Sequence, residues 1–405
     1  MPSDDVAERQ ARSLRGHVVA AARALDHAVG RQLTRVRVLV DVRTPMNAAV
    51  LRPIWATLAQ DPRIELAVVA EQPPAVARVL AGHGVQCPFL RQEDATWKRW
   101  DLALTADAWN HTPLRRCRRR MQFFHGVAGK YDLDNPSRLA AAGLHRYDRV
   151  AFINADRMNR YVGSGVVSTD QAVLVGYPKL DDLVNGRWVA SEVRASLGLE
   201  SSRPTVLFAP TFSVAGALHR AGLEIIRTTL ASGRNVVVKL HDRSLTPDAH
   251  HTAGIDWPAE LAIFASHPRF ALADGADVAP LLAAADVLIT DHSTVGFEFA
   301  LLDRPIVVYD APDLLAAARI DADKWVLLRS MAEVVRSTSE LVPAIDRAFA
   351  HPERHSAARQ ASRALFAWPG ESTARALTVV YELLELTPPS TSVRPVSSKN
   401  DSRPH

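Results

Sequence analysis

The chain has 405 residues, of which 47% are hydrophobic and 23% are charged. This balance is typical of a globular protein, and the length allows two domains with separate cores. Lysine and arginine exceed aspartate and glutamate by 48 to 44, a net charge of +4 that is too small to select a partner by itself. The two cysteines, Cys87 and Cys117, exclude a disulfide framework. Without a long apolar run or the apolar core of a signal peptide, we expect a soluble, cytoplasmic protein.

Arginines are concentrated in two segments, residues 9–37 and the run RRCRRR at 115–120. Residues 5–34 carry apolar side chains at helical spacing on one side and arginines on the other, so residues 1–35 are interpreted as a basic N-terminal helix. This helix either docks on the first domain or lies on a membrane surface. The two arginine clusters suit an anionic partner such as a membrane surface, a nucleic acid or a phosphorylated substrate, and the alternative is a solvated basic face.

From residue 36 the chain alternates between strands and helices. The expected strands of the first half are VRVLVDV, IELAVVAE, DLALTA, MQFFHG, RVAFIN and AVLVG, and helices are expected in NAAVLRPIWATLAQ and PPAVARVLAGHG. Strands separated by helices predict parallel βαβ units. This pattern places a first Rossmann-like domain at 36–188.

A polar stretch at 186–204 precedes a second series of the same kind. Its expected strands are TVLFAPT, NVVVKLH, RFALAD, DVLIT and PIVVYD, with helices in LHRAGLEIIRTTLASG, in VAPLLAAA and from residue 294. We therefore expect an α/β protein with a second Rossmann-like domain at 189–387. The Pro- and Ser-rich tail at 388–405 is expected to be disordered.

Polar side chains follow several of these strands. They are Thr211 and Ser213 after VLFAP, Lys239 and His241 after NVVV, Asp291, His292, Ser293 and Thr294 after DVLIT, and His125 with Gly126 after MQFF. Because ligands of parallel sheets bind at the carboxyl ends of the strands, these groups are expected to converge there and form a phosphate site. Each also has an ordinary alternative: Ser293 or Thr294 as a helix N-cap, Lys239 as a surface residue, His241 as a strand-end histidine.

Other motifs point away from metals, dinucleotides and nucleic acids. Asp321-Ala322-Asp323 has the D-x-D spacing of metal-dependent sugar transferases, but no strand leads directly into it. There is no G-x-G-x-x-G after the first strand and no G-x-x-x-x-G-K-[ST]. No aromatic side chains alternate with the arginines of RRCRRR. We expect no metal, no cofactor and no nucleic acid partner.

One long segment, ADVLITDHSTVGFEFALLDRPIVVYD, resembles the "LITDYSS…FDF…LLxKPIIFY" signature of the CDP-glycerol glycerophosphotransferase family, which includes teichoic acid polymerases. Four further segments resemble that family in the same order: FFHGVAGK its His-Gly segment, VGYPKLDDLV its "GxPRxD", VLFAPTF its "LYAPTF" and VVVKLHD its "KxHP". Together they span roughly residues 120–310.

The resemblance implies a GT-B fold, with two Rossmann-like domains facing a central cleft. The donor would be CDP-glycerol or a similar CDP-activated polyol, and the acceptor a polymer or lipid-linked hydroxyl. By position, His125 would be the general base, and Lys239 with His241 would address the pyrophosphate. Ser293 and Thr294 would bind the donor phosphates beside Thr211. Gly126 and Asp291 would shape the site.

Glu298 lies one turn into the helix from 294, where it is a candidate to accept hydrogen bonds from ribose hydroxyls; the alternative is a solvated helix residue. Fixed hydrogen-bond donors around the phosphates can support the transfer without a dedicated set of metal ligands. A histidine whose pKa is near its ordinary value is suited to act as the general base. The reaction would take place in the cytoplasm, with the basic helix and RRCRRR holding the protein at the inner face of the membrane as a further hypothesis.

The sequence departs from the signature at Asp242 (usually Pro), His292 (Tyr), Thr294 (Ser) and Val127-Ala128-Gly129 (Thr-Pro). These departures leave the polyol and the acceptor open. A second interpretation is a GT-B glycosyltransferase that uses a nucleotide sugar for a surface polysaccharide. A UDP-N-acetylglucosamine 2-epimerase is disfavoured because DHSTVGFEF lacks its Gly-Gly and paired glutamates. A third is a non-catalytic anion-binding protein.

Overall fold

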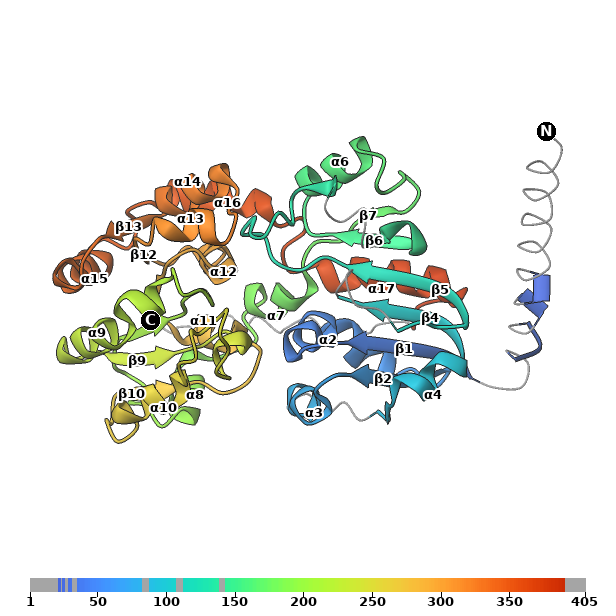
Figure 1. The fold of residues 1–405 in the computed structure, drawn as a ribbon, viewed down its shortest axis with the longest axis horizontal. Helices are drawn as coiled ribbons and strands as arrows, with labels where there is room; N and C mark the ends of the chain where they lie inside the picture. Colours follow the sequence, from blue (N-terminus) through green and yellow to red (C-terminus); the bar gives the residue numbers. More distant parts are fainter. Residues whose placement is uncertain are drawn as a thin grey trace, which may run out of the picture.

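The structure is a computed structural model that describes residues 35–389 except 82–86, 107–111 and 138–142, together with a few positions between 21 and 30. Those few positions are helical, while the rest of the expected N-terminal helix and the expected tail beyond 389 lie outside the described residues. The described chain forms two α/β units side by side (Figure 1). No helix in this part of the chain is long and apolar enough to cross a membrane.

The first unit is built on a seven-stranded sheet in the order β3-β2-β1-β4-β5-β6-β7, in which every neighbouring pair is parallel. Its strands are β1 (Val36–Val42), β2 (Ile64–Ala70), β3 (Phe89–Leu90), β4 (Arg99–Thr105), β5 (Arg116–Phe123), β6 (Arg149–Phe152) and β7 (Ala172–Leu174). Its helices are α2 (Pro45–Ala59), α3 (Pro73–Ala81), α4 (Gln92–Trp97), α6 (Ala155–Gly163) and α7 (Asp181–Val184), with 3-10 turns η1 (Leu144–Arg146) and η2 (Pro178–Leu180).

The second unit is built on a six-stranded parallel sheet in the order β10-β9-β8-β11-β12-β13. Its strands are β8 (Thr205–Phe208), β9 (Asn235–Val238), β10 (Phe270–Leu272), β11 (Val287–Thr290), β12 (Ile306–Tyr309) and β13 (Ala332–Val335). The helices that follow α7 are α8 (Ala190–Ser196), α9 (Ala217–Ala231), α10 (Trp257–Leu261), α11 (Ala279–Ala284), α12 (Thr294–Ala300), α13 (Asp313–Ala317), α14 (Ala322–Ser330), α15 (Leu341–Ala350), α16 (Ser356–Ser362) and α17 (Ser372–Leu384). The expected α/β class with two parallel sheets is confirmed.

Strand β5 begins five residues before the strand expected at MQFF, so that prediction of its start is wrong. The sequence RCRRR of the arginine run lies inside β5, paired with β4 from Arg116 onward. Backbone hydrogen bonds form this ladder whatever the side chains, which is why a charged run can be a strand. Arg118 and Arg119 form ion pairs with Glu385 and Asp148.

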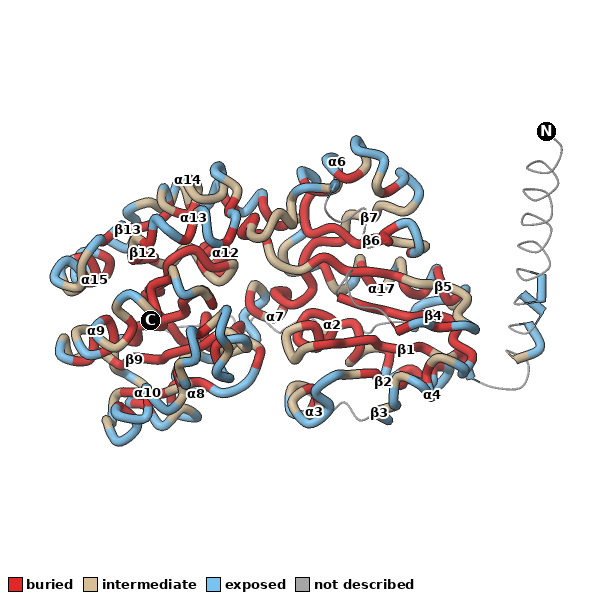
Figure 2. Tube along the Cα trace, in the orientation of Figure 1, coloured by how far each residue is buried: buried red, intermediate tan, exposed pale blue. Residues whose placement is uncertain are grey.

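The side chains of the strands alternate between separate apolar clusters. In β1, Val38 and Val40 belong to one core cluster, whereas Leu39 faces another. In β8, Leu207 joins the cluster of Val38 while Val206 and Phe208 belong to a third. The shared cluster thus runs from one sheet to the other, and both sheets are buried on two faces as parallel sheets require (Figure 2).

The chain passes between the units twice. It leaves the first unit after α7 and returns after α16, so that α17 packs against α2, η2 and β4 (Figure 1). The two passages meet at Asp181, whose carboxylate accepts hydrogen bonds from the backbone N–H groups of Gly370, Ser372 and Thr373. The helix α17, at 372–384 in sequence, therefore belongs in space to the first unit.

Candidate active site

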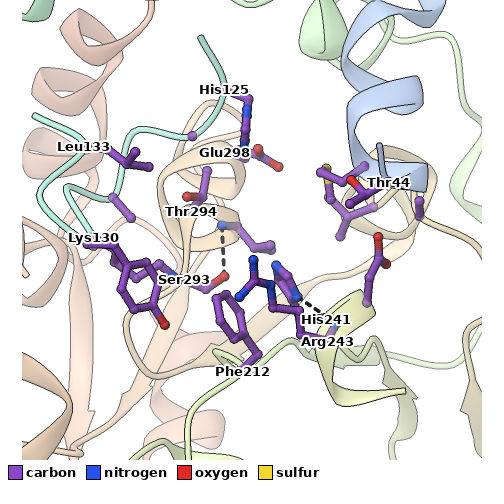
Figure 3. Close-up of a pocket in the computed structure, with 18 of the residues that line it drawn as sticks. Thr44, His125, Lys130, Leu133, Phe212, His241, Arg243, Ser293, Thr294 and Glu298 are labelled. Atoms are coloured by element: carbon purple, nitrogen blue, oxygen red, sulfur yellow. Dashed lines mark hydrogen bonds between the residues drawn. The ribbon is translucent and has the colours of Figure 1, made fainter. Parts of the chain in front are cut away.

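A cavity of about 470 Å³ lies where the carboxyl ends of strands from both sheets meet. Of the predicted site residues, the cavity is lined by His125, Gly126, Lys239, His241, Ser293, Thr294 and Glu298. Figure 3 shows His125 entering from the first unit, opposite Ser293 and His241 of the second. The predicted convergence of strand-end residues is present. Thr211 and Asp291 stand behind the lining rather than in it.

The two histidines are held in opposite tautomers. The ring of His125 donates from Nδ1 to the carbonyl of Ala106 at 2.7 Å, so in the neutral ring Nε2 is the nitrogen that can take a proton. The ring of His241 instead accepts at Nδ1 from the backbone N–H of Arg243 at 3.2 Å, so its Nε2 carries the hydrogen. The first histidine is arranged as a base and the second as a donor.

Electrostatics around His241 keep it neutral. Burial lowers its pKa well below the ordinary value, and the charges of Lys130 and Lys239 act in the same direction. Its ring lies against Phe212, with ring centroids 4.1 Å apart. A neutral, positioned Nε2–H of this kind can hydrogen-bond a phosphate oxygen without first giving up a proton.

Asp291 organises the turn between β11 and α12. This fully buried carboxylate accepts hydrogen bonds from three backbone N–H groups, those of Thr211 (2.9 Å), His292 (2.6 Å) and Ala217 (2.9 Å). The Thr211 hydroxyl in turn donates to the His292 carbonyl at 2.7 Å. The pair ties the end of β8 to the end of β11, which fits the shaping role expected for Asp291.

The hydroxyls of Ser293 and Thr294 lie at the start of α12. Ser293 is its N-cap, and its Oγ accepts from the Val295 N–H at 3.4 Å, so the ordinary capping role is present alongside exposure to the cavity. Gly126 faces them from the first unit: its φ is +75°, and a Cβ there would lie 3.3 Å from Thr294 Oγ1. A glycine allows this close approach.

Glu298 is not a solvated helix residue, so that alternative is wrong. Both of its carboxylate oxygens lie 3.1 Å from Nζ of Lys179, which comes from η2 of the first unit. Both side chains are buried, and the pair joins the two units at the wall of the cavity. The ribose-binding role of Glu298 stays a prediction. Lys179 would compete with the ribose hydroxyls for the same carboxylate.

Lys239 is buried, which excludes the surface alternative. Its Nζ donates to the Leu240 carbonyl, and burial lowers its pKa, with the Asp242 carboxylate opposing the shift. Asp242, at the position where the family signature has Pro, also lines the cavity. Burial raises the pKa of Asp242. The charge of Lys239 and a hydrogen bond from the Met46 backbone N–H, at the start of α2, act in the opposite direction.

His292, another departure from the signature, is fully buried behind the site. Its Nε2–H donates to the Ala128 carbonyl at 2.9 Å, and its ring stacks on Trp325. Burial lowers its pKa to about 4. Neutral above that pH, His292 connects the second unit to the segment that carries His125.

The sequence reasoning assigned no role to two lysines of the cavity, Lys130 and Lys179. Both lie in segments that resemble the family, FFHGVAGK and VGYPKLDDLV, and each follows a strand by a few residues, which is the signal that could have identified them. The D-x-D candidate is a helix cap: Asp321 accepts from the N–H groups of Asp323 and Lys324 at the start of α14.

The family model described as CDP-glycerol:poly(glycerophosphate) glycerophosphotransferase matches residues 144–381. A teichoic acid poly(glycerol phosphate) polymerase of Staphylococcus epidermidis is 25% identical over 208 residues, 49% of this chain and 27% of that protein. A teichoic acid glycerol-phosphate transferase of Staphylococcus aureus is 22% identical over 175 residues, covering 40% of this chain and 41% of that protein. The alignments thus cover less than half the length of these relatives.

Solved structures show the same fold. A histidine-to-alanine variant of the wall teichoic acid polymerase TagF superposes with a TM-score of 0.63 at 14% identity, over 94% of this chain and 97% of that one. A UDP-GlcNAc 2-epimerase from Neisseria meningitidis gives 0.55 at 11% identity, over 86% and 100%. These likenesses confirm the expected GT-B arrangement. With its family model matched over more than half of its 405 residues, the chain belongs to the CDP-glycerol:poly(glycerophosphate) glycerophosphotransferase family.

Proposed function

We propose that this chain transfers glycerol phosphate, or a related polyol phosphate, from a CDP-activated donor to a hydroxyl of a cell-surface polymer or lipid-linked precursor. The observation that carries the proposal is the pairing of oppositely tautomeric histidines across one cavity. His125 presents a basic Nε2 from the first unit, and His241 presents an N–H from the second. Family membership supplies the reaction class.

The acceptor hydroxyl oxygen attacks the phosphorus that bears the polyol, and the bond from that phosphorus to the CMP oxygen breaks. The hydroxyl proton passes to Nε2 of His125, and CMP leaves with the bonding electrons. Negative charge grows on the phosphate oxygens during this step. His241, Lys239 and the hydroxyls of Ser293 and Thr294 line the space in which that charge develops, so they are assigned to stabilise it.

The test is nucleotide release. Purified protein is incubated with CDP-glycerol, CDP-ribitol or a set of UDP-sugars, each with membrane extract as the acceptor source. We expect CMP from a CDP-polyol, loss of that release in His125→Ala, and no effect of a chelator. UDP released from a sugar donor would overturn the proposal in favour of a glycosyltransferase. Donor binding without turnover in any mixture would favour an anion-binding protein.

Attachment to the inner face of the membrane belongs to the same proposal. Its support is the arginine content of residues 9–37 and of β5, part of which is neutralised by Asp148 and Glu385. A flotation assay with vesicles of anionic lipid measures this directly. Protein that stays with the soluble fraction at low salt would remove the membrane from the proposal.

A further inference from the structure

Lys130 belongs to the first unit but reaches into the second. It lies five residues after His125 on the segment that follows β5, and its Nζ is 3.4 Å from Oγ1 of Thr211. The same Nζ stands 5.6 Å from the ring centroid of Phe212, another second-unit residue. Figure 3 shows Lys130 directed toward the space beside Ser293 and Phe212. A cation of the acceptor-side unit is thus placed among donor-side groups.

The second unit fixes this position through backbone contacts on both sides of Lys130. The Tyr131 N–H donates to the Ala318 carbonyl at 2.7 Å, and the Asp321 N–H donates to the Gly129 carbonyl at 2.9 Å. One residue earlier, the Ala128 carbonyl accepts the hydrogen bond from buried His292 already described. Four consecutive residues, 128 to 131, therefore carry contacts to the second unit.

Lys130 has no carboxylate partner in the part of the chain that the structure describes. The acid whose charge acts on it is Asp291, and both oxygens of that carboxylate already accept backbone N–H groups. Burial lowers the pKa of Lys130 to about 8, with Asp291 opposing the shift. Lys130 is partly buried, and a partly desolvated cation without a counter-ion is stabilised when an anion arrives to pair with it.

The neighbouring cations show where that anion would sit. Lys130, Lys239 and Arg243 all act on the ring of His241, and all line the same cavity. These cations come from both units and surround His241, whose Nε2 carries a hydrogen. A diphosphate, with more than one negative charge spread over two phosphorus centres, matches cations on two sides better than a single carboxylate or phosphate does.

We propose that Lys130 is a ligand for a phosphate of the nucleotide-diphosphate donor, contributed to the donor site by the segment that carries the base His125. The inference rests on the proposed function and adds a residue to its donor site. Because Lys130 and His125 share one short segment, the donor's phosphate would hold that segment, and with it the base, in place against the second unit.

Affinity for CDP, compared with affinity for cytidine, tests the assignment without turnover. Titration calorimetry is run on the full chain as wild type, Lys130→Met and Lys130→Arg, with Lys324→Met as a control. Lys324 lies beside Gly129 but does not line the cavity. Loss of a charged hydrogen bond predicts about 10- to 100-fold weaker CDP binding in Lys130→Met. Cytidine binding in all variants, and CDP binding in Lys130→Arg and Lys324→Met, should stay within about threefold of wild type.

The pH dependence gives a second readout. The titratable groups that face Lys130 are Asp291 and His292 from the turn after β11 and His241 from the segment after β9. Both histidines have lowered pKa values and stay neutral above pH 7. Since Lys130 loses its proton near pH 8, wild-type affinity for CDP should be full below that pH and fall as pH rises through it. Lys130→Arg stays charged, so its affinity should hold to a higher pH.

Three results overturn the assignment: wild-type CDP affinity in Lys130→Met, an equal loss of CDP and cytidine affinity, or an unshifted alkaline limb in Lys130→Arg. If Lys130→Met fails to fold, the alkaline limb of Lys130→Arg decides alone. The proposed function is judged separately by CMP release from the wild type. A wild type that binds CDP through Lys130 yet releases no CMP would support this assignment while overturning the proposed function.

Discussion

Removing one partner of the Lys179–Glu298 pair should destabilise the protein far more than removing both. The two side chains are 2% and 1% exposed, and Nζ lies 3.1 Å from both carboxylate oxygens. A lone buried charge left behind costs about 3–5 kcal/mol, whereas an apolar pair of similar volume is often nearly neutral. We therefore expect Lys179→Met and Glu298→Leu each to lose about 3–5 kcal/mol, and the double variant less than about 2 kcal/mol.

Equilibrium urea unfolding, followed by both tryptophan fluorescence and circular dichroism, measures these differences, because a chain of two units need not unfold in one step. The exposed pair Arg91–Asp94 is the control, and Arg91→Ala should leave the transition unchanged. A double variant that loses the sum of the two single variants would refute the reasoning. So would a Glu298→Gln variant with wild-type stability and a raised KM for the donor, since that result assigns Glu298 to the ribose.

The stability that the Lys179–Glu298 pair contributes also depends on pH in a defined direction. Burial opposes the charge on Lys179, but the carboxylate of Glu298 outweighs it and raises the pKa of Lys179 above its ordinary value. The stabilisation is therefore fully present below the unfolded pKa of about 10.4 and is lost as pH rises through the folded pKa. The stability difference between wild type and double variant should stay constant from pH 7 to 9.

Three further predictions follow from the site. Gly129→Ala should cost about 1–3 kcal/mol more than Gly165→Ala, because both have positive φ but only at 129 would a Cβ meet the Cβ of Asp321, at 2.8 Å; equal melting temperatures would contradict this. His241→Gln, which retains an N–H near Nε2, should keep more CMP release than His241→Asn, and the reverse order would reject the assigned tautomer. Asp291→Ala leaves three buried backbone N–H groups without an acceptor, so the free energy of unfolding measured in urea should fall by at least about 3 kcal/mol. Asp291→Asn should recover only part of that loss.

Most of the strand positions could be predicted from local patterns because both sheets are parallel and buried. Runs such as Val36–Val42 and Val287–Thr290 are short, valine-, leucine- or isoleucine-rich segments between turn residues, and such runs identify central strands. The edge strand β13 is only four residues long and is buried only at its two ends, so no comparable signal marks it. The start of β5 was hidden by its arginines, whose side chains say little about backbone pairing.

Some residues of the site could likewise be predicted from the sequence, and others could not. Residues at strand ends, such as His125 and Ser293, were predictable because topology alone brings strand ends together. The partner of Glu298 was not, since it lies 119 residues away in the other unit, and no local pattern encodes that contact. The position of Lys130 was hidden for the same reason: its contacts across the cavity depend on how the two units dock.

The double passage between the units sets how they can move. Two connections joined at Asp181 cannot twist independently, so the relative motion left to the units is a hinge rotation about the line through both passages. Lys179 is two residues from Asp181 in the sequence, so opening about that line would displace the Lys179–Glu298 pair little. It also follows that a fragment ending at 184 does not contain the whole first unit, and that a fragment beginning at 190 contains the second unit together with a helix of the first. The first would lack the helix that covers α2 and β4, and the second would carry that helix with no partner.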